Sequence, residues 1–204
     1  IIAKMNFNRR FNDNGLQFEV DAYPKITKGL YAYVNLGFSN SYLFPKVRYG
    51  AELYKSLPKS FEISAGFRTL KYSSTTNIYT GSLGWYTGNA YWSFRTYITP
   101  GDAGSSKSGT LNYRKYRSDA DNYFSISVGT GFSPLINQFD FGGNEESIIK
   151  LKSQKFSMGY YFTSSNKQNL WGTTFGIAHQ EIIFDLGNYF WIYSMGLTYE
   201  VKFR

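Results

Sequence analysis

Apolar and polar side chains alternate with a period of two along most of this chain. The apolar members recur in six segments, at 16–22, 30–38, 61–67, 90–98, 124–132 and 191–203. Successive side chains of a β-strand point to opposite faces, so each segment predicts a strand with one apolar face. No segment has a sustained apolar period of 3.6, and none approaches the roughly 18 apolar residues that a membrane-spanning helix needs.

Turn-forming residues separate these segments and divide the chain into about twelve strands of roughly 10 residues, the length that crosses a bilayer. The turns lie at 12–15, 24–29, 57–60, 86–89, 117–122 and 164–169. An antiparallel sheet of this size, with no helix to cover it, removes its edges by closing on itself. We therefore predict an all-β fold, a closed antiparallel up-and-down transmembrane β-barrel, as one domain over residues 1–204.

The side-chain sizes on the two faces indicate which face lines the interior. The apolar set is large on nearly every strand, whereas the opposite set mixes Gly, Ser, Tyr, Glu and Arg. Large apolar rows would overfill a barrel, while rows that face lipid need no close fit. Aromatic residues also gather at strand ends, as at 85–92, where rings suit the headgroup level of a bilayer. The alternative is a soluble lipid-binding barrel with its apolar face inside.

Connection lengths favour the membrane interpretation. If both termini lie on one side, the connections there are short, whereas the other side carries segments 39–46, 71–76, 100–108 and 133–148, with only 12–15 and 184–188 tight. Short periplasmic turns and longer extracellular loops are typical of outer-membrane barrels. We expect a bacterial outer-membrane location, in a Gram-negative envelope, with both termini periplasmic. The first residues lack the features of a signal peptide, so we expect that segment upstream or removed.

Several segments together resemble the YaiO-type outer-membrane β-barrel family. They are Arg48–Tyr54, the Leu57–Pro58 turn, Glu62–Tyr72 (EISAGFRTLKY), Ile78–Tyr86 (IYTGSLGWY), Tyr91–Pro100 (YWSFRTYITP) and Gly129–Pro134 (GTGFSP). The resemblance implies a porin-like outer-membrane barrel whose biochemical role is poorly defined, attached in some members to an N-terminal repeat or enzyme domain. It leaves open that this chain is the C-terminal part of a longer precursor, and it supplies no catalytic residues.

The composition and net charge of the chain indicate which classes of partner it can bind. Lys and Arg total 22 against 14 Asp and Glu, a net charge of +8 that attracts nucleic acid, anionic lipid or anionic sugars. The basic residues are spread over all strands, which argues against nucleic acid. The chain has no Cys, so disulfides, thiolate chemistry and Cys-based zinc sites are excluded. We expect contact with outer-membrane lipid or lipopolysaccharide, and with other outer-membrane proteins or a saccharide as further candidates.

Charged residues on the inward parity form the candidate site, a lumen charge network. Its members are Arg48, Glu52, Glu62, Arg68, Arg95, Arg114 and Glu200. Neighbouring strands carry opposite signs, with Arg48 and Glu52 beside Glu62 and Arg68, which predicts a ladder of ion pairs. Such a network either fills the barrel or lines a narrow channel for polar or anionic saccharides, with Tyr31, Tyr33, Tyr54, Tyr91 and Tyr97 offering faces to sugar rings.

Catalytic chemistry has little support. His179, the one histidine, has outward parity near Gln154 and Ile192, with no serine on its face. Segment 139–146 (FDFGGNEE) lacks the spacing of a calcium loop, and Ser133 is not in a nucleophile elbow. We assign no catalytic, cofactor or metal residue. We expect a non-enzymatic structural or accessory module, within a larger outer-membrane or surface-polysaccharide assembly; the alternatives are the saccharide channel and, last, a lipid-modifying enzyme.

Overall fold

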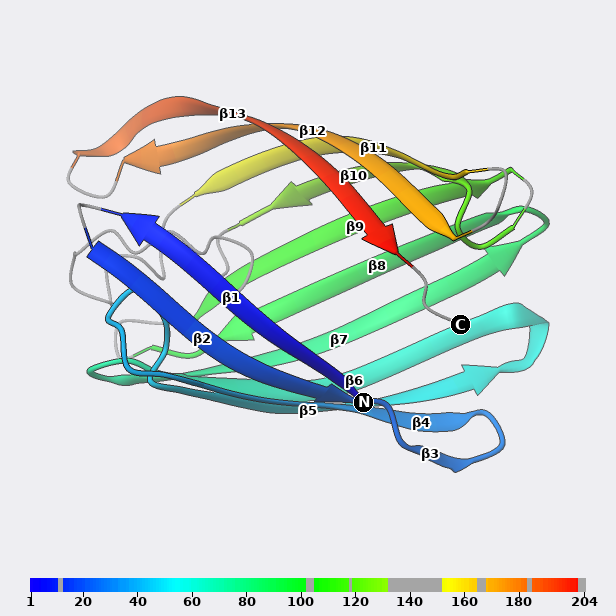
Figure 1. Cartoon of the computed structure of the whole chain (residues 1–204), viewed down its shortest axis with the longest axis horizontal. Helices are drawn as coiled ribbons and strands as arrows, with labels where there is room; N and C mark the ends of the chain where they lie inside the picture. The colour runs from blue at the N-terminus through cyan, green and yellow to red at the C-terminus, as the bar shows by residue number, and fades with distance from the viewer. Residues whose placement is uncertain are drawn as a thin grey trace.

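The computed structural model describes residues 1–10, 13–101, 105–117, 119–131, 152–164, 168–182 and 185–201. These residues form one antiparallel sheet of 13 strands, curved around a central lumen (Figure 1). The strands are β1 Ile2–Arg10, β2 Asp13–Ala22, β3 Lys25–Thr27, β4 Leu30–Ser39, β5 Val47–Leu57, β6 Phe61–Lys71, β7 Thr75–Thr87, β8 Ala90–Thr99, β9 Ser106–Tyr116, β10 Tyr123–Thr130, β11 Ser153–Thr163, β12 Asn169–Ile182 and β13 Asp185–Val201. A short 3₁₀ turn, Pro58–Ser60, joins β5 to β6.

The strands follow one another around the sheet in chain order, which confirms the all-β, up-and-down antiparallel arrangement. The three-residue β3 lies off this path and pairs only with β4, so the predicted turn at 24–29 contains a small strand of its own. Among the described strands, no pairing joins β1 to β13, and the predicted closure is therefore not seen. β1 and β13 are the two edge strands of the sheet, and they run antiparallel to each other across the opening in Figure 1 (blue and red). This is the relative direction that antiparallel pairing between them would require.

The polar face of the sheet is the buried face. On β2, Gln17 and Asp21 are each 1% exposed, whereas Phe18 and Val20, which lie between them in the sequence, are 56% and 48% exposed. The same inversion runs through β4 to β8, where polar residues are buried and large apolar side chains are exposed. A water-soluble barrel has the opposite distribution. The polar positions of the alternating pattern therefore lie on the inner face of the sheet and the apolar positions on the outer face, as predicted.

A small apolar cluster departs from this pattern. Leu70, Ile78 and Tyr97 have inward parity on β6, β7 and β8, and they are buried against one another, with Tyr72 packed alongside. The inward position of Tyr97 was predicted, whereas those of Leu70 and Ile78 were not. The cluster lies where these strands meet the connections 72–74 and 100–105.

The two ends of the sheet differ in the connections that they carry. The turn end carries the β5–β6 and β7–β8 turns, the start of β1 and the end of β13, and the loop end carries the connections after β4, β6, β8 and β10 (Figure 1). The predicted difference in length rests on one connection, between Thr130 and Ser153, because the others have similar lengths at both ends. Across the residues that the structure describes, no helix is long and apolar enough to cross a membrane.

Candidate functional site

Glu52 of β5 is the centre of one cluster on the lumen wall. Its carboxylate is 1% exposed and accepts hydrogen bonds from Arg95 Nη1 at 2.6 Å and Ser64 Oγ at 2.5 Å. Arg68 Nη2 of β6 completes the cluster at 3.6 Å from the second carboxylate oxygen. Arg95 also donates to the hydroxyl of Tyr54 at 3.1 Å. One buried acid thus holds two arginines from β6 and β8, and such charge-assisted contacts are stronger than neutral ones.

Glu19 and Asp21 of β2 form a second cluster. Arg48 Nη1 of β5 pairs with Glu19 at 2.9 Å, and its Nε donates to the Asn35 side-chain oxygen at 3.1 Å. Asn35 donates in turn to Asp21 at 2.5 Å, and Asp21 pairs with Lys4 of β1. Each residue of this cluster therefore has a partner on another strand, which ties β1, β2, β4 and β5 together.

Arg68 and Tyr33 connect the two clusters. The Arg68 guanidinium lies 5.6 Å from the centre of the Tyr33 ring, and the Tyr33 hydroxyl donates to Asp21 at 3.1 Å. A guanidinium over an aromatic face is attracted by the ring quadrupole. The two clusters therefore form one continuous polar wall from β1 to β8.

The pairing differs from the predicted ladder in one important respect. Arg48 pairs with Glu19, two strands away, because Gly37 of β4 lies between them. A Cβ on Gly37 would lie 2.7 Å from Arg48 Cγ and 3.0 Å from Glu19 Cγ, so only glycine leaves the arginine room to cross. Asn35, the other link, was missed; its inward parity on β4 was the available signal.

The remaining predicted members lie apart from these clusters. Glu62 accepts a hydrogen bond from the Tyr31 hydroxyl at 3.2 Å, and Arg114 lies 5.1 Å from the Tyr123 ring centre. Glu200 lies on β13 opposite Leu170. Within the described part of the chain, no ion pair includes Glu62, Arg114 or Glu200. The structure therefore brings together Arg48, Glu52, Arg68 and Arg95 on one wall and separates the other three.

Tyrosine rings line the lumen at the turn end. Tyr31 and Tyr54 are stacked, with centroids 4.7 Å apart and planes 6° apart, and Tyr86 lies 4.3 Å from Tyr91. Further along, Tyr123 stacks on Tyr161 at 4.6 Å. Of the tyrosines predicted to offer faces, Tyr97 differs, because it is buried in the apolar cluster at the loop end.

The opposite wall carries small side chains. Across the middle of β10 to β13 most inward positions are Gly, Ser or Thr, at Ser125, Ser127, Gly129, Ser157, Gly159, Thr174, Gly176, Ser194, Gly196 and Thr198, with Lys155 of β11 as the large exception beside Gly129. The Gly, Ser and Thr residues contribute little volume to the lumen. The charged wall thus faces a wall that leaves it space.

His179 lies on the outward face of β12, as its parity predicted. It is opposite Gln154 on β11 and Trp191 on β13, one residue from the predicted Ile192. Its ring stacks on Tyr189 at 4.7 Å and contacts Trp191 at 4.6 Å. The segment 139–146, weighed as a metal loop, and Ser133 lie outside the described residues.

No curated protein matches the chain. Among solved structures, an anion-selective porin from Comamonas acidovorans aligns with 85% of this chain at 12% identity and a TM-score of 0.46, and the chain spans about half (52%) of that porin's length. The family model of the YaiO membrane β-barrel domain matches residues 1–135. The chain therefore belongs to the YaiO membrane β-barrel domain family and is an outer-membrane β-barrel protein.

Proposed function

We propose that this barrel is a structural or accessory module of the outer membrane, seated in a larger outer-membrane or surface-polysaccharide assembly, with both termini on the periplasmic side. The observation that carries the proposal is the mutual pairing of the lumen charges. Glu52 accepts a hydrogen bond from Arg95 and forms an ion pair with Arg68, and Glu19 accepts a hydrogen bond from Arg48. Carboxylates and guanidinium groups that pair with one another leave fewer positions for a ligand, and in the Glu52 cluster only Glu52 Oε2 and Arg68 Nε are buried without a hydrogen-bond partner among the described residues. The network serves to hold the strands in register.

Conductance across a planar bilayer tests this role. The reconstituted protein is expected to remain electrically silent over long recordings, because its charged wall is occupied by internal contacts. Persistent stepwise conductance at several protein concentrations would overturn the structural role and favour a channel.

The proposal includes closure of the sheet by pairing of β1 with β13. The chain has no cysteine, so engineered pairs report this directly. Asn6→Cys on β1 is combined in turn with Ser194→Cys, Gly196→Cys and Thr198→Cys on β13, all at inward positions. Disulfides need Cα atoms about 5.5–6 Å apart, so a closed seam should cross-link strongly at one β13 position. The control pair joins Asn6→Cys with Ser157→Cys on β11 and should stay reduced; failure of all three β13 pairs would argue for an open seam.

A second candidate, a narrow channel for polar or anionic saccharides, is favoured by the small-residue wall of β10–β13 and by the stacked Tyr31–Tyr54 pair. Small side chains leave room in the lumen, and stacked rings present faces to sugars. In this case Arg68→Glu should shift the conducted current from anions toward cations. An unchanged ion preference would exclude Arg68 from a conduction path.

We propose no enzymatic activity. His179, the one candidate base, is held between the rings of Tyr189 and Trp191 on the outward face. Phospholipid vesicles incubated with the reconstituted protein should yield no free fatty acid or acyl-transfer product. A product that disappears with His179→Ala would contradict this expectation.

A further inference from the structure

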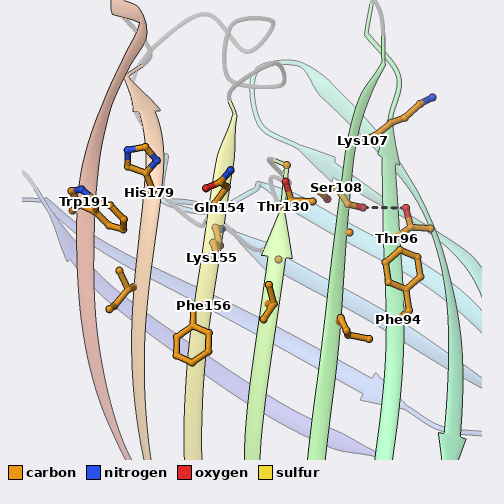
Figure 2. A pocket seen from close by; sticks show the side chains of 16 residues that line it. Phe94, Thr96, Lys107, Ser108, Thr130, Gln154, Lys155, Phe156, His179 and Trp191 are labelled. Carbon is orange, nitrogen blue, oxygen red and sulfur yellow. Dashed lines mark hydrogen bonds between the residues drawn. The ribbon is translucent and has the colours of Figure 1, made fainter.

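A groove of about 960 Å³ lies on the outward face of β8 to β13, away from the lumen network. Figure 2 shows Phe94, Phe156, His179 and Trp191 projecting in front of these strands. In the register, Leu111 of β9 and Val128 of β10 lie between Phe94 and Phe156, and the next outward position of β9 toward the loop end is Gly109, which has no side chain. The hollow therefore lies over Gly109 and the short Val128 side chain, beside the larger Phe94, Leu111 and Phe156.

The groove changes in polarity along the strand direction. Toward the middle of the sheet its lining is apolar, with Phe94, Leu111, Val128, Phe156 and Ile177. Toward the loop end it is polar, with Thr96, Lys107, Thr130, Gln154 and His179, beside the indole of Trp191. Figure 2 shows this order, with Lys107 extending to the loop end and Phe156 lying toward the middle. An apolar floor below a polar and cationic rim has the same layering as one leaflet of a membrane.

We propose that this groove is a binding site for one lipid with an anionic phosphate headgroup, taken from the leaflet at the loop end. Its acyl chains lie over Leu111, Val128 and Phe156, and its phosphate faces the ammonium of Lys107. Thr130 and Gln154 offer donors one outward position below Lys107. The site rests on the proposed placement of the apolar face in lipid, and adds to it a preference for one headgroup charge.

Lys107 provides the charge complementarity. It is exposed on the outward face of β9, opposite Ile98, whereas Lys155 of β11, two strands away, has inward parity. One lysine close to an anionic headgroup favours it by about fivefold over a neutral one. Lys115 lies on the same strand and the same face but at the turn end, outside the groove, which makes it a matched control.

Tryptophan quenching by brominated lipid tests the site. Trp191 lines the groove, while Trp85, Trp92 and Trp171 lie toward the turn end. A variant with phenylalanine at those three positions leaves Trp191 as the reporter, and a second variant retains only Trp171. Both are placed in equimolar phosphatidylglycerol and phosphatidylcholine vesicles in which either one lipid or the other carries bromine, so the surface charge stays constant. If a multiple variant does not fold, the contribution of Trp191 to quenching can be obtained by comparing the chain that has all four tryptophans with its Trp191→Phe variant.

Brominated phosphatidylglycerol is expected to quench Trp191 about fivefold more than brominated phosphatidylcholine does. The two lipids should quench Trp171 about equally. Lys107→Gln should lower the value at Trp191 to about onefold, whereas Lys115→Gln should leave it unchanged. Val128→Phe, which fills the floor, should also reduce it. Equal quenching by both lipids at Trp191 would overturn the site while leaving the membrane placement intact. Quenching of neither reporter by either lipid would overturn the placement as well.

Discussion

The two walls of the lumen are built on different physical principles. From β1 to β8 the inward face carries charged side chains that pair across strands, with Glu52 between Arg68 and Arg95. From β10 to β13 the inward positions at mid-strand are mostly Gly, Ser and Thr, with Lys155 as the exception. The first wall is stabilised by contacts between side chains, and the second by its backbone pairing. A sheet with one outer apolar face can therefore have two quite different inner faces.

The difference also determines which substitutions each wall tolerates. A buried carboxylate between two guanidinium groups cannot be removed without leaving uncompensated charge. A serine that faces open lumen makes few contacts and is easily replaced. The comparison makes four predictions about the free energy of unfolding, measured by urea titration in phosphatidylcholine vesicles.

The largest effect is expected for Glu52→Leu. This change leaves Arg68 and Arg95 without their carboxylate in a largely buried site, and should lower the free energy of unfolding by about 3–5 kcal/mol. Adding Arg95→Leu should restore part of the loss, since one unpaired charge is then removed. A loss below about 1 kcal/mol for the single variant would mean that water reaches the cluster and screens it.

A smaller effect is expected on the second wall at Gly172. A Cβ there would lie 2.6 Å from the Tyr161 ring, which itself stacks on Tyr123. Gly172→Ala should therefore displace the ring and cost about 1–3 kcal/mol, as overpacking does. The Tyr161→Ala background provides the control, because most of the penalty of Gly172→Ala should disappear once the ring is gone, leaving only the 3.2 Å contact with Thr198 Cβ.

Tyr31→Phe should have a modest effect. It removes the hydroxyl that donates to Glu62 at 3.2 Å but retains the ring that stacks on Tyr54. One such hydrogen bond contributes about 1 kcal/mol. The matched change Tyr54→Phe removes instead the hydroxyl that accepts from Arg95, so a similar loss there would show that both hydroxyls belong to the wall's hydrogen-bond network.

Ser157→Ala should have the smallest effect, within about 0.5 kcal/mol of the parent chain. Ser157 lies at an inward position in the middle of β11, opposite Ser127 and Gly176. A substantial loss would place an undetected polar contact on this wall, and would weaken the contrast between the two walls.

The alternation of side chains was sufficient to predict the strands and the two faces. Leu16 to Ala22 and their polar neighbours are sorted as the period-two pattern requires, because strand geometry depends on local sequence alone. Closure of the barrel was also predicted, but β1 and β13 are unpaired in the described residues. Whether an edge pairs depends on how the curvature of the whole sheet places its two ends, which no local pattern encodes.

The partners of the charged residues were less predictable. Parity identified Arg48, Glu52, Arg68 and Arg95 as inward, yet it could not assign Arg48 to Glu19. That choice follows from the register of β2, β4 and β5 and from the space above Gly37. Pairing between strands is a property of register and side-chain reach, and several registers are compatible with the same alternation. The groove on β8–β13 was not predicted for the same reason.

The most direct test of the central claim compares neighbouring residues on one strand. The chain has no cysteine, so Ile126→Cys, Ser127→Cys and Val128→Cys on β10 each provide a single site for a nitroxide spin label. In vesicles, we predict that labels at 126 and 128 collide mainly with oxygen, which concentrates in lipid, and that the label at 127 collides mainly with a water-soluble nickel complex. The reverse order, or equal access of both reagents at all three sites, would contradict the assignment of the apolar face to lipid and the polar face to the lumen.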